Sequence, residues 1–336
     1  MLAEWLLVAY ATSMRILPTA VMFLASLMAA GQSVSAAELR CLATTGMIGD
    51  LVKAVVGDRG QVEVLMSSGV DPHLYQPTRS DLAKVLAADV IFYNGLHLEG
   101  RMDEAFARAQ KSGRSVCAVA EQLPKQSLLH DGEDPEAHDP HVWMDPQRWR
   151  MVLLAIRDRC VFLDPSGRDV YESNANAYLK RLNALDEYAF KVLQSVPGEV
   201  RVLVTAHDAF GYFGNRFGFE VIGLQGISTE SEASVQDVNR LVNLLVQRKI
   251  PAIFVESTVP EKGIRALIEG ASAQGHTVKI GGSLYSDAMG NSGTWSGTYL
   301  GMIDHNVTTI ARSLGGEAPQ GGWRSTGNSP STESSP

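Results

Sequence analysis

Residues 170–205 have the sequence VYESNANAYLKRLNALDEYAFKVLQSVPGEVRVLVT, and this stretch divides the chain into two halves. We predict one long helix from Val170 to about Gln194. Residues 195–198 end it, because proline and glycine together stop a helix. An apolar strand follows at Val202–Thr205, and an alternation of strands and helices starts again there.

Both halves alternate strands with helices. In the first half the predicted strands are Leu39–Ala43, Gln61–Met66, Val90–Tyr93 and Ser115–Val119, and the helices are Met47–Val56, Arg79–Ala88, Met102–Ala109 and Gln147–Phe162. In the second half the strands are Val202–Thr205, Glu220–Ile222, Ala252–Val255 and Thr277–Ile280, and the helices are Phe210–Phe217, Ser234–Gln247, Pro260–Gly270 and Thr298–Leu314. Such alternation implies parallel sheets covered by helices. We therefore predict an α/β fold with two lobes, residues 37–169 and 196–315, joined by a linking helix at 170–195.

The two ends of the chain have compositions that differ from the rest. Arg15 precedes an apolar run at 16–30, and small residues follow it, which predicts a signal peptide at 1–36 and cleavage after Ala36. Met14 is an alternative start, and an uncleaved membrane anchor is the alternative interpretation, although the run is short for a spanning helix. Residues 316–336 are rich in glycine, serine and proline, which predicts a disordered tail.

The overall composition limits the classes of function. The chain has 336 residues, of which 45% are hydrophobic and 20% charged, which is typical of a globular protein. Its formal net charge is -8, and no basic run is present. An acidic surface disfavours nucleic-acid binding and attracts cations.

Three cysteines fall in the predicted exported chain. Export permits one disulfide, for which Cys117 and Cys160 are the candidate pair, leaving Cys41 buried on the first strand. Three reduced thiols in the core are the alternative that stays open, because the sequence does not determine the geometry between two cysteines.

Side chains of the kinds that bind metal ions lie where the predicted helices and strands begin or end. His73, His207 and Asp287 each follow a strand, and His141 precedes the helix at 147–162. The carboxyl ends of parallel strands line the cleft of an α/β protein, so the set predicts a cation held between the lobes. A single histidine in a loop is more often a surface or hydrogen-bonded residue, so the prediction rests on all four together.

Short motifs follow one another in order along residues 39–314. They are Thr44-Thr45-Gly46-Met47-Ile48-Gly49-Asp50, Asp71-Pro72-His73, Asn94-Gly95-Leu96, Asp139-Pro140-His141-Val142-Trp143-Met144-Asp145-Pro146, Thr205-Ala206-His207-Asp208-Ala209-Phe210-Gly211, Gly226-Ile227-Ser228-Thr229-Glu230, Phe254-Val255-Glu256-Ser257 and Asp287-Ala288-Met289-Gly290. Together they resemble the TroA-like family, the zinc- and manganese-binding solute-binding proteins of ABC transporters. The resemblance implies two α/β lobes, a rigid linking helix and one metal ligand from each of four segments. By motif, those ligands are His73, His141, His207 and Asp287.

This ligand set suits zinc. Nitrogen-rich sites favour Zn(II), and four ligands complete a tetrahedron without an open position for a substrate water. Manganese-selective relatives generally have two imidazoles and two carboxylates, so the resemblance implies Zn(II) as the transported ion and Mn(II) as the alternative. We expect a periplasmic, monomeric receptor, not an enzyme, that passes the ion to the membrane permease of an ABC importer.

Two other classes of function stay open. One is a metal-dependent hydrolase in which Asp287 acts as a base, although the chain has no His-Glu-x-x-His and no Gly-x-Ser-x-Gly motif. The other is a surface adhesin, which would require a large exposed apolar patch.

Residues near the predicted ligands have two interpretations each. The loop at 130–139 contains two histidines and five acidic residues. It is either a weak metal-collecting loop or a solvated acidic loop, and we favour the second.

His97 is a candidate neighbour of the site, whereas ordinary roles are expected for His276 and His305. Glu256 either orients a ligand imidazole or ends its strand as a solvated carboxylate. Three aromatic residues flank the predicted ligands and either wall the site from water or belong to the core: Trp143, Tyr212 and Tyr285.

Overall fold

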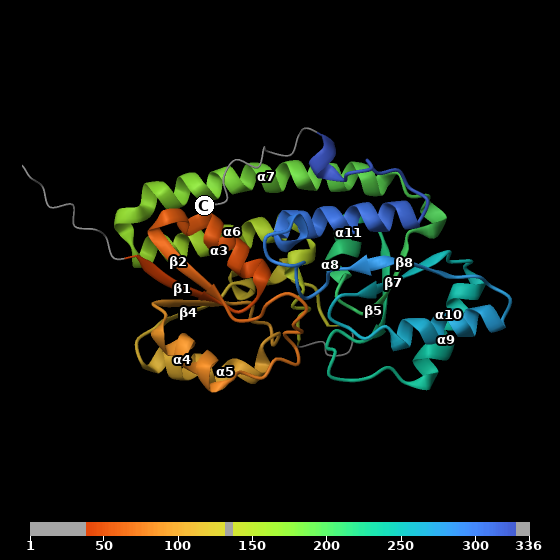
Figure 1. Cartoon of the computed structure of the whole chain (residues 1–336), viewed down its shortest axis with the longest axis horizontal. Coiled ribbons are helices and arrows are strands. Elements are labelled where there is room, and N and C mark those ends of the chain that lie inside the picture. The colour runs from red at the N-terminus through yellow and green to blue at the C-terminus, as the bar shows by residue number, and fades with distance from the viewer. Residues whose placement is uncertain (1–37, 132–136, 327–336) are drawn as a thin grey trace, which may run out of the picture. The chain divides into compact units, whose positions relative to one another are not determined.

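The computed structural model describes residues 38–131 and 137–326, so the predicted signal peptide and its alternatives lie outside the described residues. The described chain forms the two predicted α/β lobes and the long helix between them (Figure 1). Among the described helices, none is both long and apolar enough to cross a bilayer.

The first lobe contains a four-stranded parallel sheet with the order β2-β1-β3-β4. Its strands are β1 (Leu39–Ala43), β2 (Gly60–Val64), β3 (Val90–Tyr93) and β4 (Ser115–Ala118). Its helices are α3 (Gly46–Val56), α4 (Arg79–Ala87), α5 (Asp103–Lys111) and α6 (Pro146–Leu163). Cys41 and Ala43 of β1 face a core with α3 and α6, while Leu42 faces a separate core with α4 and α5. Strand alternation therefore covers both faces of the sheet.

The second lobe contains two parallel strand pairs. β5 (Val202–His207) pairs with β6 (Glu220–Gln225), β7 (Ala252–Glu256) pairs with β8 (Lys279–Leu284), and β5 lies beside β7. The helices are α8 (Gly211–Phe217), α9 (Val235–Gln247), α10 (Lys262–Ala273) and α11 (Tyr299–Ser313). Leu203 and Phe254 face the core shared with α11, whereas Val204 and Ile253 face the core beneath α9 and α10.

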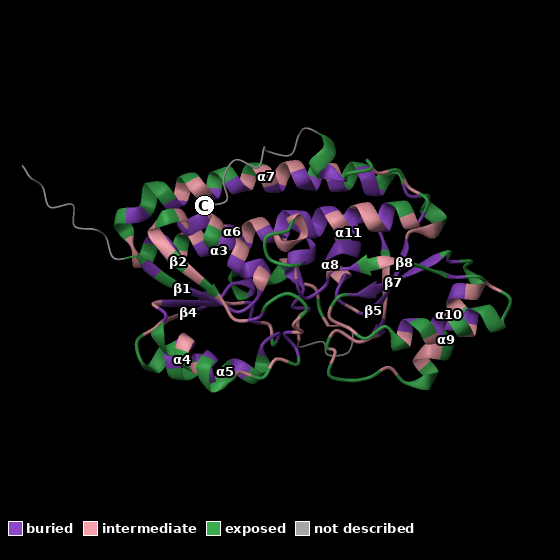
Figure 2. Cartoon of the chain, in the orientation of Figure 1, coloured by how far each residue is buried: buried purple, intermediate pink, exposed green. Residues whose placement is uncertain are grey.

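The linking helix α7 (Arg168–Gln194) has 27 residues, which corresponds to about 40 Å of helix. It packs against α3, α6 and α11, and Figure 2 shows its buried face turned toward them. Leu182 of α7, Val52 of α3 and Ile303 of α11 belong to one continuous apolar core. A wide rotation of the lobes about α7 would expose this core to water, which is unfavourable.

Two expectations differ from the structure. Residues 316–326, predicted to be disordered, are held by Trp323, which is buried and donates its backbone N–H to Asp304 Oδ1 at 2.7 Å. The Trp323 ring also lies beside Trp295, and this burial overrides the polar composition of the segment. Residues 327–336 lie outside the described residues.

The candidate disulfide between Cys117 and Cys160 is absent from the described structure. Cys41, Cys117 and Cys160 are all free, buried thiols, which is the alternative interpretation. They pack as small apolar side chains in the first lobe. Burial raises the pKa of Cys41 to about 12, so this thiol stays protonated and unreactive at neutral pH.

Candidate metal centre

The four predicted ligand residues meet at one place between the lobes. His207 is the last residue of β5, and Asp287 lies three residues beyond the end of β8. His73 lies in the turn-rich segment after β2, and His141 lies directly before the short 3-10 helix Val142–Met144. One ligand-type atom from each residue lies within 4.8 Å of every other, and all four side chains are buried. The described residues contain no second group of this kind.

The spacing of these atoms suits a small metal ion. The Nε2 atoms of His73 and His141 are 3.3 Å apart, and His141 Nε2 is 3.4 Å from Asp287 Oδ1. His207 Nε2 is 3.2 Å from Asp287 Oδ2. Ligands of a tetrahedral zinc ion with bonds of about 2.0–2.1 Å are separated by roughly 3.3–3.4 Å. These three pairs therefore already have the separation that a shared ion requires.

Several polar atoms of the cluster have no hydrogen-bond partner among the described residues. They include His207 Nε2 and Asp287 Oδ1, both of which are buried. Burying a polar atom without a partner is costly. A cation placed among these atoms would remove that cost.

Two of the three imidazoles are backed by a buried carboxylate. Asp139 Oδ1 is 2.7 Å from His141 Nδ1, and Glu256 Oε2 is 2.6 Å from His207 Nδ1. The second contact is a close ion pair without good hydrogen-bond alignment, whereas Glu256 Oε1 accepts the His207 backbone N–H at 2.9 Å. Such carboxylates orient a ring so that its other nitrogen faces the site. Glu256 therefore lies where it can orient the His207 ring, which is the first of the two roles considered for it.

The charges of the cluster are strongly coupled. Burial lowers the pKa of His141, but Asp139 and Asp287 outweigh burial and raise it to about 9. For His207, Glu256 and Asp287 likewise outweigh burial and raise the pKa well above its usual value. Burial lowers the pKa of His73 to about 3. Despite burial, the neighbouring His207 and His141 hold the pKa of Asp287 well below its usual range.

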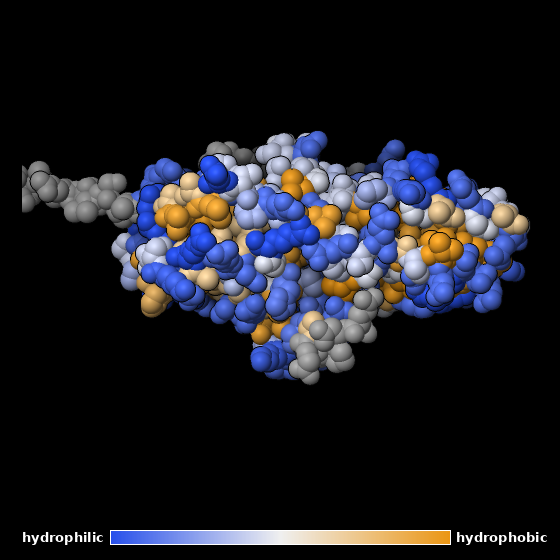
Figure 3. All heavy atoms as spheres, turned by 90° about the horizontal axis from the view of Figure 1, so that it is seen from below, coloured by the Kyte–Doolittle hydropathy of each residue, from blue (hydrophilic) through white to orange (hydrophobic). Residues whose placement is uncertain are grey.

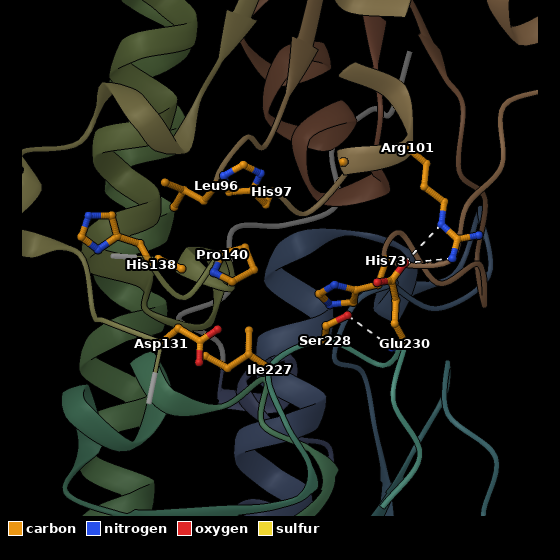
Figure 4. A pocket seen from close by; sticks show the side chains of 12 residues that line it. His73, Leu96, His97, Arg101, Asp131, His138, Pro140, Ile227, Ser228 and Glu230 are labelled. Atoms are coloured by element: carbon orange, nitrogen blue, oxygen red, sulfur yellow. Dashed lines mark hydrogen bonds and ion pairs between the residues drawn. The ribbon is translucent and has the colours of Figure 1, made fainter. Parts of the chain in front are cut away.

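Of the four candidate ligands, His73 lies nearest to solvent. It is 7% exposed, whereas His141 and His207 are 0% exposed and Asp287 is 1% exposed. It borders a pocket of about 310 Å³, together with His97, Arg101, Ser228 and Glu230 (Figure 4). This pocket therefore reaches the cluster at His73, and a second pocket of about 200 Å³ reaches it at Asp287.

The aromatic residues near the site have mixed roles. The Trp143 ring lies 5.2 Å from the His141 ring, and its Nε1–H donates to Ser286 O in the other lobe at 2.8 Å. The Tyr212 hydroxyl donates to the backbone carbonyl of Asp139. Tyr285 contacts His305, away from the cluster. Trp143 therefore walls the site, Tyr212 supports it from behind, and Tyr285 is a structural residue.

The other histidines lie outside the cluster. His97 lines the pocket beside His73. The ring nitrogens of His276 and His305 contact backbone carbonyls, those of Ile250 and Ser283. His130 and His138 form an isolated antiparallel bridge with ring centroids 5.0 Å apart, and residues 132–136 of their loop lie outside the described residues.

The contact of Asp139 with the His141 ring was not predicted from the sequence, although a repeated Asp-Pro-His pattern pointed to it. Asp71-Pro72-His73 and Asp139-Pro140-His141 share one spacing. In both segments, Asp Oδ1 accepts the histidine backbone N–H at 2.9 Å, as in an Asx turn. An aspartate two residues before a ligand histidine is therefore well placed to reach it.

A two-lobed α/β protein with a buried histidine–carboxylate cluster between its lobes defines a class of metal-binding solute receptors. The family described as ZnuA, zinc-uptake complex component A periplasmic, matches residues 41–313, and the chain belongs to this family of ABC-transporter substrate-binding proteins. The resemblance predicted from the motifs is confirmed.

Relatives of the chain differ in the metal for which they are named. The chain is 47% identical over 271 residues to the zinc-binding protein TroA of Treponema pallidum (strain Nichols), covering 81% of this chain and 87% of TroA. It is 46% identical over 277 residues to the manganese-binding lipoprotein MntA of Bacillus subtilis (strain 168), covering 82% and 90%. The solved structure of periplasmic zinc-binding TroA matches with a TM-score of 0.80 at 45% identity, covering 82% of this chain and 99% of that one.

Proposed function

We propose that the protein captures Zn(II) in the periplasm, between His73, His141, His207 and Asp287, and delivers it to the membrane permease of an ABC importer. The observation that carries this proposal is the group of four buried side chains, whose ligand-type atoms all lie within 4.8 Å of one another, three pairs of them at 3.2–3.4 Å. Both relatives compared above are named as metal-binding proteins and neither as an enzyme, which supports a carrier over a hydrolase.

Metal analysis of the purified mature protein tests this function. We expect one tightly held divalent ion per chain, which is removed by a chelator and restored by Zn(II). The variant in which His141 and His207 are both changed to Ala should hold none. A parent protein that binds neither Zn(II) nor Mn(II) would exclude the proposal.

Delivery to a permease requires a surface that spans both lobes. The face seen in Figure 3 is mostly hydrophilic, with separate apolar patches on both halves. Leu74, directly after His73, is 44% exposed, and Val235 at the start of α9 is 77% exposed. Exposed apolar side chains in both lobes fit a partner that contacts them together. Because α7 joins the lobes through a shared core, we propose that release uses local loop movement.

A manganese receptor is the second candidate. The chain is 46% identical to a manganese-binding lipoprotein. In addition, Asp287 directs Oδ1 toward His141 and Oδ2 toward His207. A carboxylate that binds through both oxygens would give five donor atoms, and Mn(II) favours higher coordination and oxygen ligands more than Zn(II) does.

We expect the parent protein to bind Zn(II) at least about tenfold more tightly than Mn(II), which is roughly 1.4 kcal/mol. Three imidazoles make the site nitrogen-rich, and the intrinsic order of metal affinities also favours zinc. Competition titrations of the metal-free protein with both ions measure the ratio. The His207→Glu variant should shift it toward manganese. Equal affinities in the parent, or an unchanged ratio in this variant, would mean that lobe geometry determines selectivity.

The Glu256→Gln variant should bind zinc roughly 10- to 100-fold more weakly. It keeps the size of the side chain but removes the charge that faces His207 Nδ1 at 2.6 Å. Isothermal titration with a competing chelator measures the change. Glu261→Gln is the matched control, because Glu261 forms an exposed ion pair with Arg265 in the same lobe. Parental affinity in Glu256→Gln would mean that Glu256 does not position His207.

A further inference from the structure

A segment after α11 packs onto the second lobe although it lies beyond the part of the chain that the family matches. Residues 316–326 turn back along α11 (Figure 1). The Glu317 backbone N–H donates to Ser195 Oγ at 2.7 Å, and the Arg312 side chain of α11 donates to the Pro319 carbonyl. The family match ends at residue 313. Membership of the family therefore assigns this segment no role.

One buried carboxylate of α11 joins the segment to another loop. Asp304 accepts the Trp323 backbone N–H through Oδ1 at 2.7 Å and the Trp295 Nε1–H through Oδ2 at 2.9 Å. The rings of these two tryptophans have centroids 6.2 Å apart. Gly322 has a positive φ of 66°, and a Cβ at this position would lie 2.6 Å from Asp304 Oδ1. Glycine is therefore required for the segment to dock on Asp304.

Trp295 lies in the loop that follows Asp287. Within residues 288–297, the Gly290 backbone N–H donates to the carbonyl of Ser296, the residue after Trp295, at 2.8 Å. On the other side of Asp287, the Ser286 carbonyl accepts the Trp143 Nε1–H. The backbone of Asp287 is thus tied on both sides, to Trp143 before it and to the Trp295 turn after it.

The loop at 288–297 borders empty space on the face toward the first lobe. The pocket of about 200 Å³ lies against Met289, Gly290 and Gly297 and extends to Asp287. On this side the exposed Ser68 hydroxyl donates to the Met289 carbonyl, but water replaces an exposed hydrogen bond at little cost. Close packing therefore does not hold the loop from this face, and its anchor is the buried group on α11.

We propose that Asp304 and Trp323 are positioning residues that hold the loop at 288–297 and thereby fix Asp287 as a metal ligand. This inference rests on the proposed function and adds a role for the C-terminal segment. Asp287 Oδ1 lies 3.4 Å from His141 Nε2, and its Oδ2 lies 3.2 Å from His207 Nε2, so a shift of its backbone disturbs both contacts. A site needs its ligands held within about 0.5 Å. Docking of the segment and binding of the metal therefore favour each other.

The test detaches the segment in the full mature protein without changing a ligand. Gly322→Ala places a methyl group against Asp304, and Trp323→Ala removes the buried ring. Titration against a competing chelator measures the zinc affinity, which we expect to be roughly tenfold weaker in each variant.

The matched control is Gly275→Ala. Gly275 also has a positive φ, 80°, but open space surrounds a Cβ there. It lies before β8, whereas Asp287 follows that strand. This variant carries the same backbone strain without detaching the segment, and it should keep the parental affinity.

Hydrogen exchange separates positioning from a purely structural role. Coupling between two sites is reciprocal, so zinc should slow amide exchange of residues 316–326 roughly tenfold relative to the metal-free parent, as read by mass spectrometry. The proposal is overturned if Gly322→Ala and Trp323→Ala keep the parental affinity, if Gly275→Ala loses as much, or if zinc leaves this exchange unchanged. A parent that binds no metal would instead overturn the proposed function, so the two failures are distinct.

Discussion

Replacing His73 by Ala is expected to weaken zinc binding by roughly 100- to 1,000-fold, because about 10–16 kcal/mol of binding free energy is typically shared among four ligands. The variant should keep the stability of the metal-free protein. His73 lies in a turn, and its ring is backed by no carboxylate among the described residues, so its removal leaves no buried charge without a partner. Calorimetric titration gives the affinity, and thermal unfolding of the metal-free protein gives the stability.

His207→Ala should lose similar affinity but behave differently without metal. Its removal leaves the buried Glu256 carboxylate facing an empty space instead of the His207 ring at 2.6 Å. Breaking such a buried pair typically costs about 3–5 kcal/mol, so the free energy of unfolding should fall. His276→Ala, which removes a ring whose Nε2 contacts the Ile250 carbonyl away from the cluster, serves as the control for both variants. Near-parental zinc affinity in His73→Ala or His207→Ala would remove that residue from the ligand set.

Zinc affinity is expected to rise steeply with pH between about 6 and 8. The neighbouring carboxylates raise the pKa of His141 to about 9 and that of His207 well above its usual value, so both rings are protonated in the metal-free protein at neutral pH. A metal needs the deprotonated nitrogen, and binding must therefore release these protons. Because the pKa of His141 lies above this range and that of His207 is also raised, each proton that is released makes the affinity about tenfold weaker per unit fall in pH.

With two protons released, the apparent affinity should change by roughly a hundredfold per pH unit below the pKa of His141. Titration calorimetry in buffers of different ionisation enthalpy counts the protons directly. His73 contributes none, since burial lowers its pKa to about 3. In Asp139→Asn, the pKa of His141 should fall and one of the two protons should disappear. A buffer-independent enthalpy in the parent would mean that the imidazoles are neutral before the metal arrives.

Much of the fold followed from local patterns. The helix predicted to begin at Arg79 does begin there, and a capping box at Thr78 and Asp81 has both of its hydrogen bonds. Strand β3 has the predicted bounds, Val90–Tyr93. Apolar runs punctuated by turn residues are strong local signals, so such elements are visible without tertiary information.

Other elements depend on partners that are distant in sequence. β8 was predicted as Thr277–Ile280 but spans Lys279–Leu284 and includes Gly281 and Gly282. Two glycines weaken a strand signal, yet a Cβ at Gly281 would lie 2.6 Å from the Phe254 ring of β7. Pairing with β7 therefore selects glycine there, and this requirement exists only in the assembled sheet.

The sequence by itself determined the two α/β lobes, the long helix between them and the four residues that meet at the candidate site. Those features arise from hydrophobic periodicity, from strand ends and from motifs, all of which are local. Only the tertiary structure decided that Asp139 and Glu256 back two of the histidines while Asp71 turns its second oxygen to Thr229. It also decided that the cysteines remain free and that Trp323 holds residues 316–326. These outcomes depend on distances and directions between side chains far apart in the chain, and such geometry arises only when the lobes pack against each other.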